Sequence, residues 1–92
     1  MTIRHEKERV YIENEDGTLL AEAAFPIRDG TAVLERTFVD PSLRGQGIAG
    51  RLIEEAVSVI RASGLRARPV CSYAVRWFSE HPDEVKDLLE TK

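Results

Sequence analysis

The sequence predicts an α+β (α/β) fold, a mixed sheet with helices in the order β-β-β-α-β-α-α. Two Asp-Gly turns, Asp16-Gly17 and Asp29-Gly30, separate three segments of strand character. After residue 47 the apolar residues take helical spacing, and another strand candidate follows. We therefore expect an antiparallel meander followed by a strand–helix–strand unit, in which the third and fourth strands pair in parallel.

The three strands of the meander are expected over Arg9–Asn14, Thr18–Ile27 and Thr31–Val39. Val10 and Ile12 alternate with polar residues in the first strand, and Pro26 weakens the end of the second. In the third strand, simple alternation divides the side chains between two faces, with Val33, Glu35, Thr37 and Val39 opposite Leu34, Arg36 and Phe38.

The main helix is expected over Gly47–Ser63, because its apolar residues form one stripe and its charged residues lie off that stripe. The stripe consists of Ile48, Ala49, Leu52, Ile53, Ala56, Val57 and Ile60. Gly64 stands where a helix C-terminal cap is commonly found. This pattern predicts an amphipathic helix packed on the sheet.

Three elements are expected after the main helix: a strand over Leu65–Cys71, a helix over residues 72–80, and a final helix beginning at Pro82. Trp77 and Phe78 are candidate core residues of the middle helix. The final helix has two acidic residues, Asp83 and Glu84, at its positive N-terminal end. Leu88 and Leu89 are expected to pack it against the core.

Length, charge and cysteine content restrict the class of protein. A chain of 92 residues predicts one domain over residues 1–92. A net charge of −3 argues against a nucleic-acid partner, and no apolar segment is long enough for a membrane span or resembles a signal. A single cysteine, Cys71, excludes an internal disulfide and fits a reducing compartment. We expect a cytoplasmic protein, and the sequence leaves self-association open.

The segment between the third strand and the main helix is the candidate ligand site. A loop over Asp40–Arg44 leads into Gly45-Gln46-Gly47, which opens the helix. Glycines let several N–H groups converge, and the first N–H groups of a helix have no acceptor within it. Together with the charge of Arg44, they predict an anion site, usually for phosphate.

Three phosphate-binding patterns and a turn without ligand compete for this segment. Residues 45–50 satisfy GxGxxG, but five residues precede Gly45 and the strand over Leu65–Cys71 has no acidic residue, which argues against a dinucleotide site. A P-loop would require Lys-Ser or Lys-Thr, and neither is present. The third pattern, Arg-x-x-Gly-x-Ala, is met by Arg44, Gly47 and Ala49.

The third pattern resembles the coenzyme A pyrophosphate loop of the GNAT superfamily, the acetyl-coenzyme A dependent N-acetyltransferases. Residues 69–73, Pro-Val-Cys-Ser-Tyr, and the later His81-Pro82 are similar to a small single-domain branch of that superfamily. The resemblance implies a GNAT-like mixed sheet, acetyl-coenzyme A as co-substrate, and a primary amine, small molecule or protein, as acceptor. It also implies coenzyme contacts at Phe38, Val39, Arg44, Gly45, Gln46, Gly47, Ile48 and Ala49.

Two residues are candidates for catalysis. Cys71 is expected at the end of the fourth strand, where the resemblance puts it near the thioester and the next helix dipole favours its thiolate. It is either a nucleophile or base, or a small core residue. The same resemblance implies that Tyr73 donates a proton to the departing coenzyme A thiolate; the alternative is a packing residue.

The remaining polar residues leave the mechanism open. Glu35 is more readily a cross-strand or solvent-facing carboxylate than a general base, and His81 is more readily a hydrogen-bonding residue at a helix start. With His5 in the N-terminal tail, no His, Cys and Asp residues have metal-site spacing, so we expect no metal. A coenzyme A binding module without catalysis and an interaction protein whose loop merely turns remain alternatives.

Overall fold

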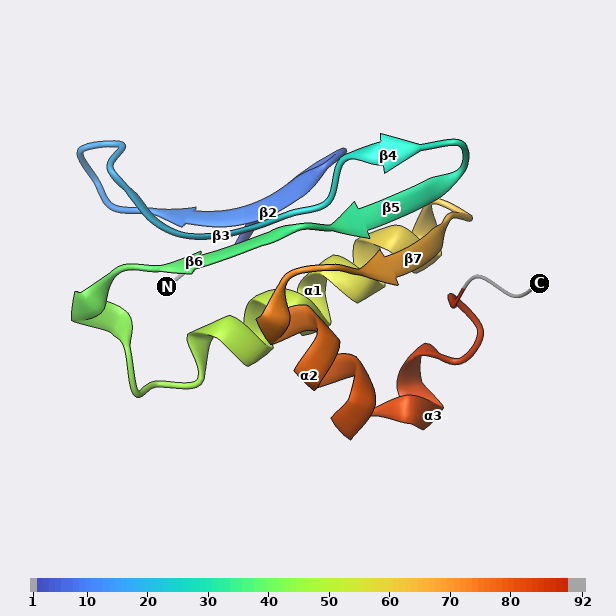
Figure 1. Cartoon of the computed structure of the whole chain (residues 1–92). Coiled ribbons are helices and arrows are strands. Elements are labelled where there is room, and N and C mark those ends of the chain that lie inside the picture. The colour runs from blue at the N-terminus through green and yellow to red at the C-terminus, as the bar shows by residue number, and fades with distance from the viewer. Residues whose placement is uncertain (1, 90–92) are drawn as a thin grey trace.

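The computed structural model describes residues 2–89, in which strands form two small sheets and the helices lie on one side of them (Figure 1). The first sheet has the order β1-β2-β3-β6 and the second the order β4-β5-β7. The strands are β1 (Arg4–Glu6), β2 (Arg9–Glu13), β3 (Leu19–Ala24), β4 (Ile27–Arg28), β5 (Thr31–Leu34), β6 (Arg36–Val39) and β7 (Arg66–Pro69). The helices are η1 (Pro41–Leu43), a short 3-10 helix, α1 (Ile48–Ala62), α2 (Ser72–Glu80) and α3 (Pro82–Val85).

The predicted topology is confirmed. β3 pairs antiparallel with β2 on one side and with β6 on the other, as the meander requires. β5 and β7 pair in parallel on either side of α1 in the chain. The sequence did not predict β1, which pairs antiparallel with β2. Its three residues are exposed and show no apolar alternation, so the sequence carries no strand signal there. They form a strand because they pair with the edge of β2.

The second and third predicted strands are each broken in two. Pro26 lies at the first break, between β3 and β4, and has no N–H to donate to a neighbouring strand. Glu35 lies at the second break. Arg36 is the register partner of Ala24, and the N–H of Glu35 also donates to the Ala24 carbonyl at 3.2 Å. Two residues thus oppose one, which is a β-bulge.

This bulge makes the simple alternation predicted for the third strand wrong. Leu34 is fully buried, and Val39, predicted on the opposite face, packs against the same core. Thr37 and Val39 face the core side because their register partners are Ala23 and Ala21, which are buried. The extra residue at the bulge reverses the side-chain direction along the rest of the strand.

The helix α1 supplies the centre of the core. Its buried side chains are those of the predicted stripe, Leu52, Ile53, Ala56, Val57 and Ile60. They share one core cluster with Val10 and Ile12 of β2, with Leu34 of β5 and with Phe25, which follows β3. Gly64 follows the helix with φ of +72°, a left-handed conformation that suits glycine at this cap.

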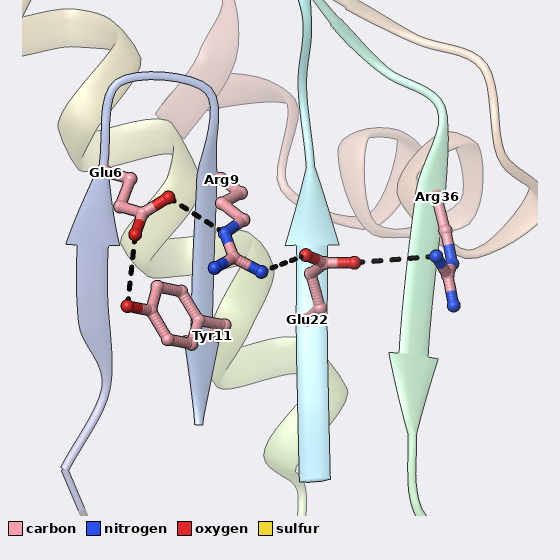
Figure 2. Close-up of polar contacts among 5 residues, drawn as sticks. All are labelled: Glu6, Arg9, Tyr11, Glu22 and Arg36. Atoms are coloured by element: carbon pink, nitrogen blue, oxygen red, sulfur yellow. Dashed lines mark hydrogen bonds and ion pairs between the residues drawn. The ribbon is translucent and has the colours of Figure 1, made fainter. Parts of the chain in front are cut away.

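The face of the first sheet that points away from α1 carries a network of charged side chains (Figure 2). Glu22, whose side chain is only 9% exposed, pairs with Arg9 at 2.8 Å and with Arg36 at 3.6 Å. Glu6 accepts from Arg9 at 2.9 Å and from the Tyr11 hydroxyl at 3.1 Å. Hydrogen bonds from these groups lower the pKa of Glu6, and the two carboxylates raise the pKa of Arg9. The network ties β1, β2, β3 and β6 together.

The C-terminal part differs from the prediction in its boundaries. β7 ends at Pro69, so Cys71 is not a strand residue but the N-cap of α2. α2 itself spans the expected range and buries Trp77 and Phe78. α3 ends at Val85, and the expected closing leucines lie beyond it. Leu88 is buried, whereas Leu89 is 36% exposed and forms a parallel bridge with Ala67. Over residues 2–89, no helix is long and apolar enough to cross a membrane.

Replacement of Phe25 by alanine should destabilise the fold strongly, because this fully buried ring stands where β3 gives way to β4. The loss of a buried phenylalanine costs ~3–5 kcal/mol, which in a domain of this size lowers Tm by roughly 15–25 °C. Thermal denaturation followed by circular dichroism measures it. Val75→Ala on the exposed side of α2 is the control, and equal Tm values for the two variants would contradict this core assignment.

Candidate functional site

A short helix fixes the loop between β6 and the glycine turn. Asp40 caps η1, its Oδ2 accepting from the Ser42 hydroxyl at 2.6 Å and from the Ser42 N–H at 2.9 Å. The hydrogen bond from the Ser42 hydroxyl, followed by the one from its N–H, lowers the pKa of Asp40. The loop is therefore held by local hydrogen bonds as it approaches α1.

The glycine turn adopts the left-handed conformation that the sequence motif requires. Gly45 has φ of +83° and Gly47 has φ of +73°, and Gly47 is the N-cap of α1. The first helical bond runs from the N–H of Arg51 to the carbonyl of Gly47 at 3.2 Å. The N–H groups of residues 48–50 precede it and therefore point out of the positive end of the helix.

A pocket of about 210 Å³ opens at this helix end. It is lined by Val39, Leu43, Arg44, Gly45, Gly47, Ile48, Ala49 and Tyr73. Six of the eight predicted coenzyme-contact residues thus meet in one place, together with the predicted proton donor. Leu43 is the lining residue that sequence reasoning missed; it carries no motif and its position follows only from η1.

The two other predicted contact residues lie outside that lining. The Gln46 amide reaches the Ser42 carbonyl at 3.5 Å. Phe38 belongs to the outer face, where the Arg36 guanidinium lies 5.8 Å from the centre of its ring. Arg44, inside the pocket, also reaches the Val39 carbonyl with its Nε at 3.4 Å.

The strands β6 and β7 diverge beside this pocket. Parallel pairing of β5 with β7 ends at Leu34 and Pro69. The Leu34 carbonyl then accepts from the N–H groups of both Val70 and Cys71 at 3.0 Å. The chain turns into α2, while β6 continues along β3 as the edge strand of its sheet. Figure 1 shows the two segments separating at this point.

The edge of β6 presents main-chain groups to the resulting opening. The Asp40 N–H donates to the Leu20 carbonyl at 2.7 Å, on the β3 side. Because bonding direction alternates along an antiparallel strand, Phe38 also directs its N–H and C=O toward β3. Thr37 and Val39 direct theirs to the opposite edge, where the opening lies.

The two candidate catalytic residues stand on the first turn of α2 but at different points of the site. The Cys71 sulfur is half-buried, accepts from the Ala74 N–H at 3.4 Å and lies 3.3 Å from the Thr37 hydroxyl oxygen. Tyr73 is 38% exposed and lines the pocket. Its hydroxyl would lie 3.5 Å from a Cβ built on Gly50, which places it over the first turn of α1.

Thr37 was missed by the sequence analysis, because simple alternation carries no sign of the bulge that turns its side chain toward Cys71. The other polar candidates have structural contacts. Glu35 is exposed at the bulge, 3.9 Å from Arg28. The His81 Nδ1 bonds to the Trp77 carbonyl at 2.8 Å, and its ring stacks on the indole at 4.0 Å. Within the described part of the chain, no three His, Cys, Asp or Glu residues gather as metal ligands would.

Comparison with known proteins gives a family for this chain. A family model described as GCN5-related N-acetyl-transferase matches residues 9–88. A GCN5-like N-acetyltransferase candidate from Staphylococcus aureus superimposes with a TM-score of 0.73 at 25% identity, over 99% of this chain and 89% of that one. Curated protein sequences include no significant match.

Two longer proteins share the fold. A candidate acetyltransferase from Agrobacterium tumefaciens has a TM-score of 0.64 at 25% identity, over 79% of this chain and 56% of that one. N-acetylglutamate synthase from Neisseria gonorrhoeae, solved with coenzyme A and N-acetyl-glutamate, has a TM-score of 0.63 at 21% identity, over 80% and 18%. The chain therefore spans about half of the first protein and less than a fifth of the second, and the second likeness concerns the fold alone.

Alanine substitutions at Gly47 and Gly50 should act in opposite directions. Gly47→Ala should destabilise the protein by ~1 kcal/mol, because a Cβ strains the left-handed conformation. Gly50→Ala should stabilise it by ~0.5 kcal/mol, because this glycine is helical and a methyl group would meet the Tyr73 hydroxyl at ordinary contact distance. Chemical denaturation measures both, and a stabilising Gly47→Ala would disprove the turn geometry.

Proposed function

Because this chain belongs to the GCN5-related N-acetyltransferase family, we propose that it transfers an acetyl group from acetyl-coenzyme A to a primary amine. The observation that carries the proposal is the pocket at the N-terminus of α1, where two left-handed glycines and Arg44 meet Tyr73. A helix N-terminus with converging N–H groups stabilises phosphate. The pyrophosphate of the donor lies there in our proposal, on the N–H groups of residues 44–49.

The pantetheine arm is proposed to enter the opening between β6 and β7. An amide-bearing chain laid along a strand edge can pair with its main-chain groups as an added strand does. Val39 and Thr37 direct such groups toward the opening, so they are the proposed partners of the arm. The main-chain groups of Phe38 face β3. Its proposed role is therefore only to hold Thr37 and Val39, its neighbours in the chain, at the spacing that the arm requires.

Two routes for the acetyl group fit this placement. In the first, the Cys71 thiolate attacks the thioester carbon, a new carbon–sulfur bond forms, and the bond to coenzyme A sulfur breaks. The amine then attacks the acetyl-cysteine, releases the Cys71 thiolate and loses a proton to water. In the second, the amine attacks acetyl-coenzyme A directly, the new carbon–nitrogen bond replaces the bond to coenzyme A sulfur, and the amine loses its proton to water. In both, Tyr73 donates a proton to the departing coenzyme A thiolate, and main-chain N–H groups in the opening stabilise the carbonyl oxygen.

The acceptor is proposed to approach from the face of the sheet that carries the charged network. In Figure 1 the helices lie on the other side of the strands, so no described helix walls this approach.

The proposed step assigns no role to a metal. The net charge of −3 favours an amine over a nucleic acid as partner, and we place the protein away from membranes in the cytoplasm, where the thiol of Cys71 stays reduced.

A coenzyme A binding module without catalysis is the main alternative. It shares the pocket and differs in chemistry, so it would bind coenzyme A without consuming acetyl-coenzyme A in the presence of any amine. An interaction protein whose loop merely turns would show no thermal shift with coenzyme A. Mass spectrometry of a panel of amines after incubation with acetyl-coenzyme A separates the proposed transferase from both.

Substitution of Gly47 tests the pyrophosphate site. Gly47→Asp should weaken coenzyme A binding at least ~10-fold relative to Gly47→Asn, because a carboxylate repels the pyrophosphate within a few ångströms. Asparagine has the same size and tolerates the same left-handed conformation, so it is the matched control. Isothermal calorimetry gives both affinities. Equal values for the two variants would show that the phosphates bind elsewhere.

Substitution of Cys71 tests the covalent route. Cys71→Ser preserves the cap of α2, because serine accepts from the same helix N–H, but its hydroxyl is a weak nucleophile. If the covalent route operates, wild-type protein gains the mass of one acetyl group early in the reaction, and Cys71→Ser loses transfer while retaining coenzyme A affinity. Full activity of Cys71→Ser, with no early adduct on the wild type, would leave direct attack by the amine.

A further inference from the structure

We infer that Thr37 is a positioning residue, whose hydroxyl holds the sulfur of Cys71 at the apex of the strand opening and stabilises it as a thiolate. The inference rests on the proposed function, because that function is what gives the Cys71 sulfur a chemical task. The contacts between the sulfur and its neighbours do not depend on any activity. Thr37 belongs to β6 and Cys71 to the start of α2, so one residue comes from each side of the opening.

Two groups contact the Cys71 sulfur from different elements. The Ala74 N–H, from the first turn of α2, donates to it at 3.4 Å. The Thr37 hydroxyl oxygen lies 3.3 Å from it. The N–H is fixed by the helix backbone, whereas the hydroxyl can rotate. A thiolate can therefore accept from both groups, while a neutral thiol can donate its proton to the hydroxyl oxygen. Donors that converge on a thiolate favour that form.

The β-bulge determines that a hydroxyl occupies this place. Leu34, before the bulge, faces the core side of the sheet. If the same residues formed a regular strand without the bulge, alternation would turn Arg36 to the core side and Thr37 to the outer face. With it, Thr37 lies opposite Ala23 on the core side, toward the start of α2, and Arg36 pairs with Glu22 on the outer face. The bulge thus places the Thr37 hydroxyl beside the Cys71 sulfur and the Arg36 guanidinium on the opposite face of the sheet.

The bifurcated carbonyl of Leu34 fixes the other half of the arrangement. It accepts from the N–H of Cys71 at 3.0 Å, so the main chain of the cysteine is anchored to the end of β5. The Thr37 side chain lies three residues further along the same segment. The sulfur and hydroxyl are therefore held by one continuous stretch of hydrogen-bonded backbone, which makes their contact a property of the fold.

The test is the reactivity of Cys71 in Thr37→Val, with Thr37→Ser as the conservative variant. Valine has nearly the shape of threonine but no hydroxyl, whereas serine keeps the hydroxyl. At one neutral pH, without ligand, we expect Thr37→Val to slow alkylation by iodoacetamide ~10-fold, equivalent to ~1.4 kcal/mol. The thiolate absorbance in the ultraviolet should fall with it. We expect Thr37→Ser to return the rate to within ~2-fold of wild type.

Three results would overturn the inference: Thr37→Val alkylating at the wild-type rate, Thr37→Val alkylating faster, or Thr37→Ser slowing as much as Thr37→Val. Thermal melts establish that each variant is folded, and Thr37→Ala undergoes the same measurement if the valine variant does not fold. Wild-type coenzyme A binding is measured separately. If the wild type does not bind coenzyme A, the proposed function is wrong and the role of Thr37 still stands. If it binds coenzyme A but Thr37→Val reacts at the wild-type rate, the role of Thr37 is wrong and the proposed function still stands.

Discussion

The site depends on the point where the two sheets part. A continuous strand from Thr31 to Val39 would keep pairing with the segment after α1, and no opening would form. The bulge at Glu35 and the double acceptance by the Leu34 carbonyl end that pairing. One strand continues with β3 and the other turns into α2. Every proposed contact of the donor, from the helix N-terminus to the sulfur of Cys71, lies along the edges that this separation exposes.

The sheet beside this opening is held by more than its strand ladders. In the outer network, Glu22 joins Arg9 on β2 to Arg36 on β6 across β3. Its carboxylate is nearly buried and would be costly to leave without partners. On the other face, the fully buried Leu52, Ile53 and Ile60 of α1 press against the same strands. The edge strand β6 is thus braced from both faces while one of its edges stays accessible.

The sequence predicted most of the fold, because turns and apolar periodicity are local signals. The Asp-Gly turns, the stripe of α1 and the glycines before it needed no knowledge of distant residues. The errors have non-local causes. β1 is a strand only because β2 offers it an edge. The bulge at Glu35 depends on Ala24 and puts Thr37 and Val39 on the same face as Leu34, which no alternation rule can detect.

The same distinction applies to the candidate site. The loop residues could be found from sequence because their chemistry lies in consecutive positions: a cation, two left-handed glycines and a helix start. The proposed acyl end of the opening is assembled from segments far apart in the chain, so sequence named Cys71 and Tyr73 but not Thr37. Once the bulge turns Thr37 inward, the sulfur has a side-chain neighbour as well as a helix N–H. The sulfur of Cys71 meets a hydroxyl and a helix N–H, while the same residue also packs against the hydrophobic core. The structure thus supplies contacts for both interpretations of this cysteine, as a reactive thiol and as a small core residue.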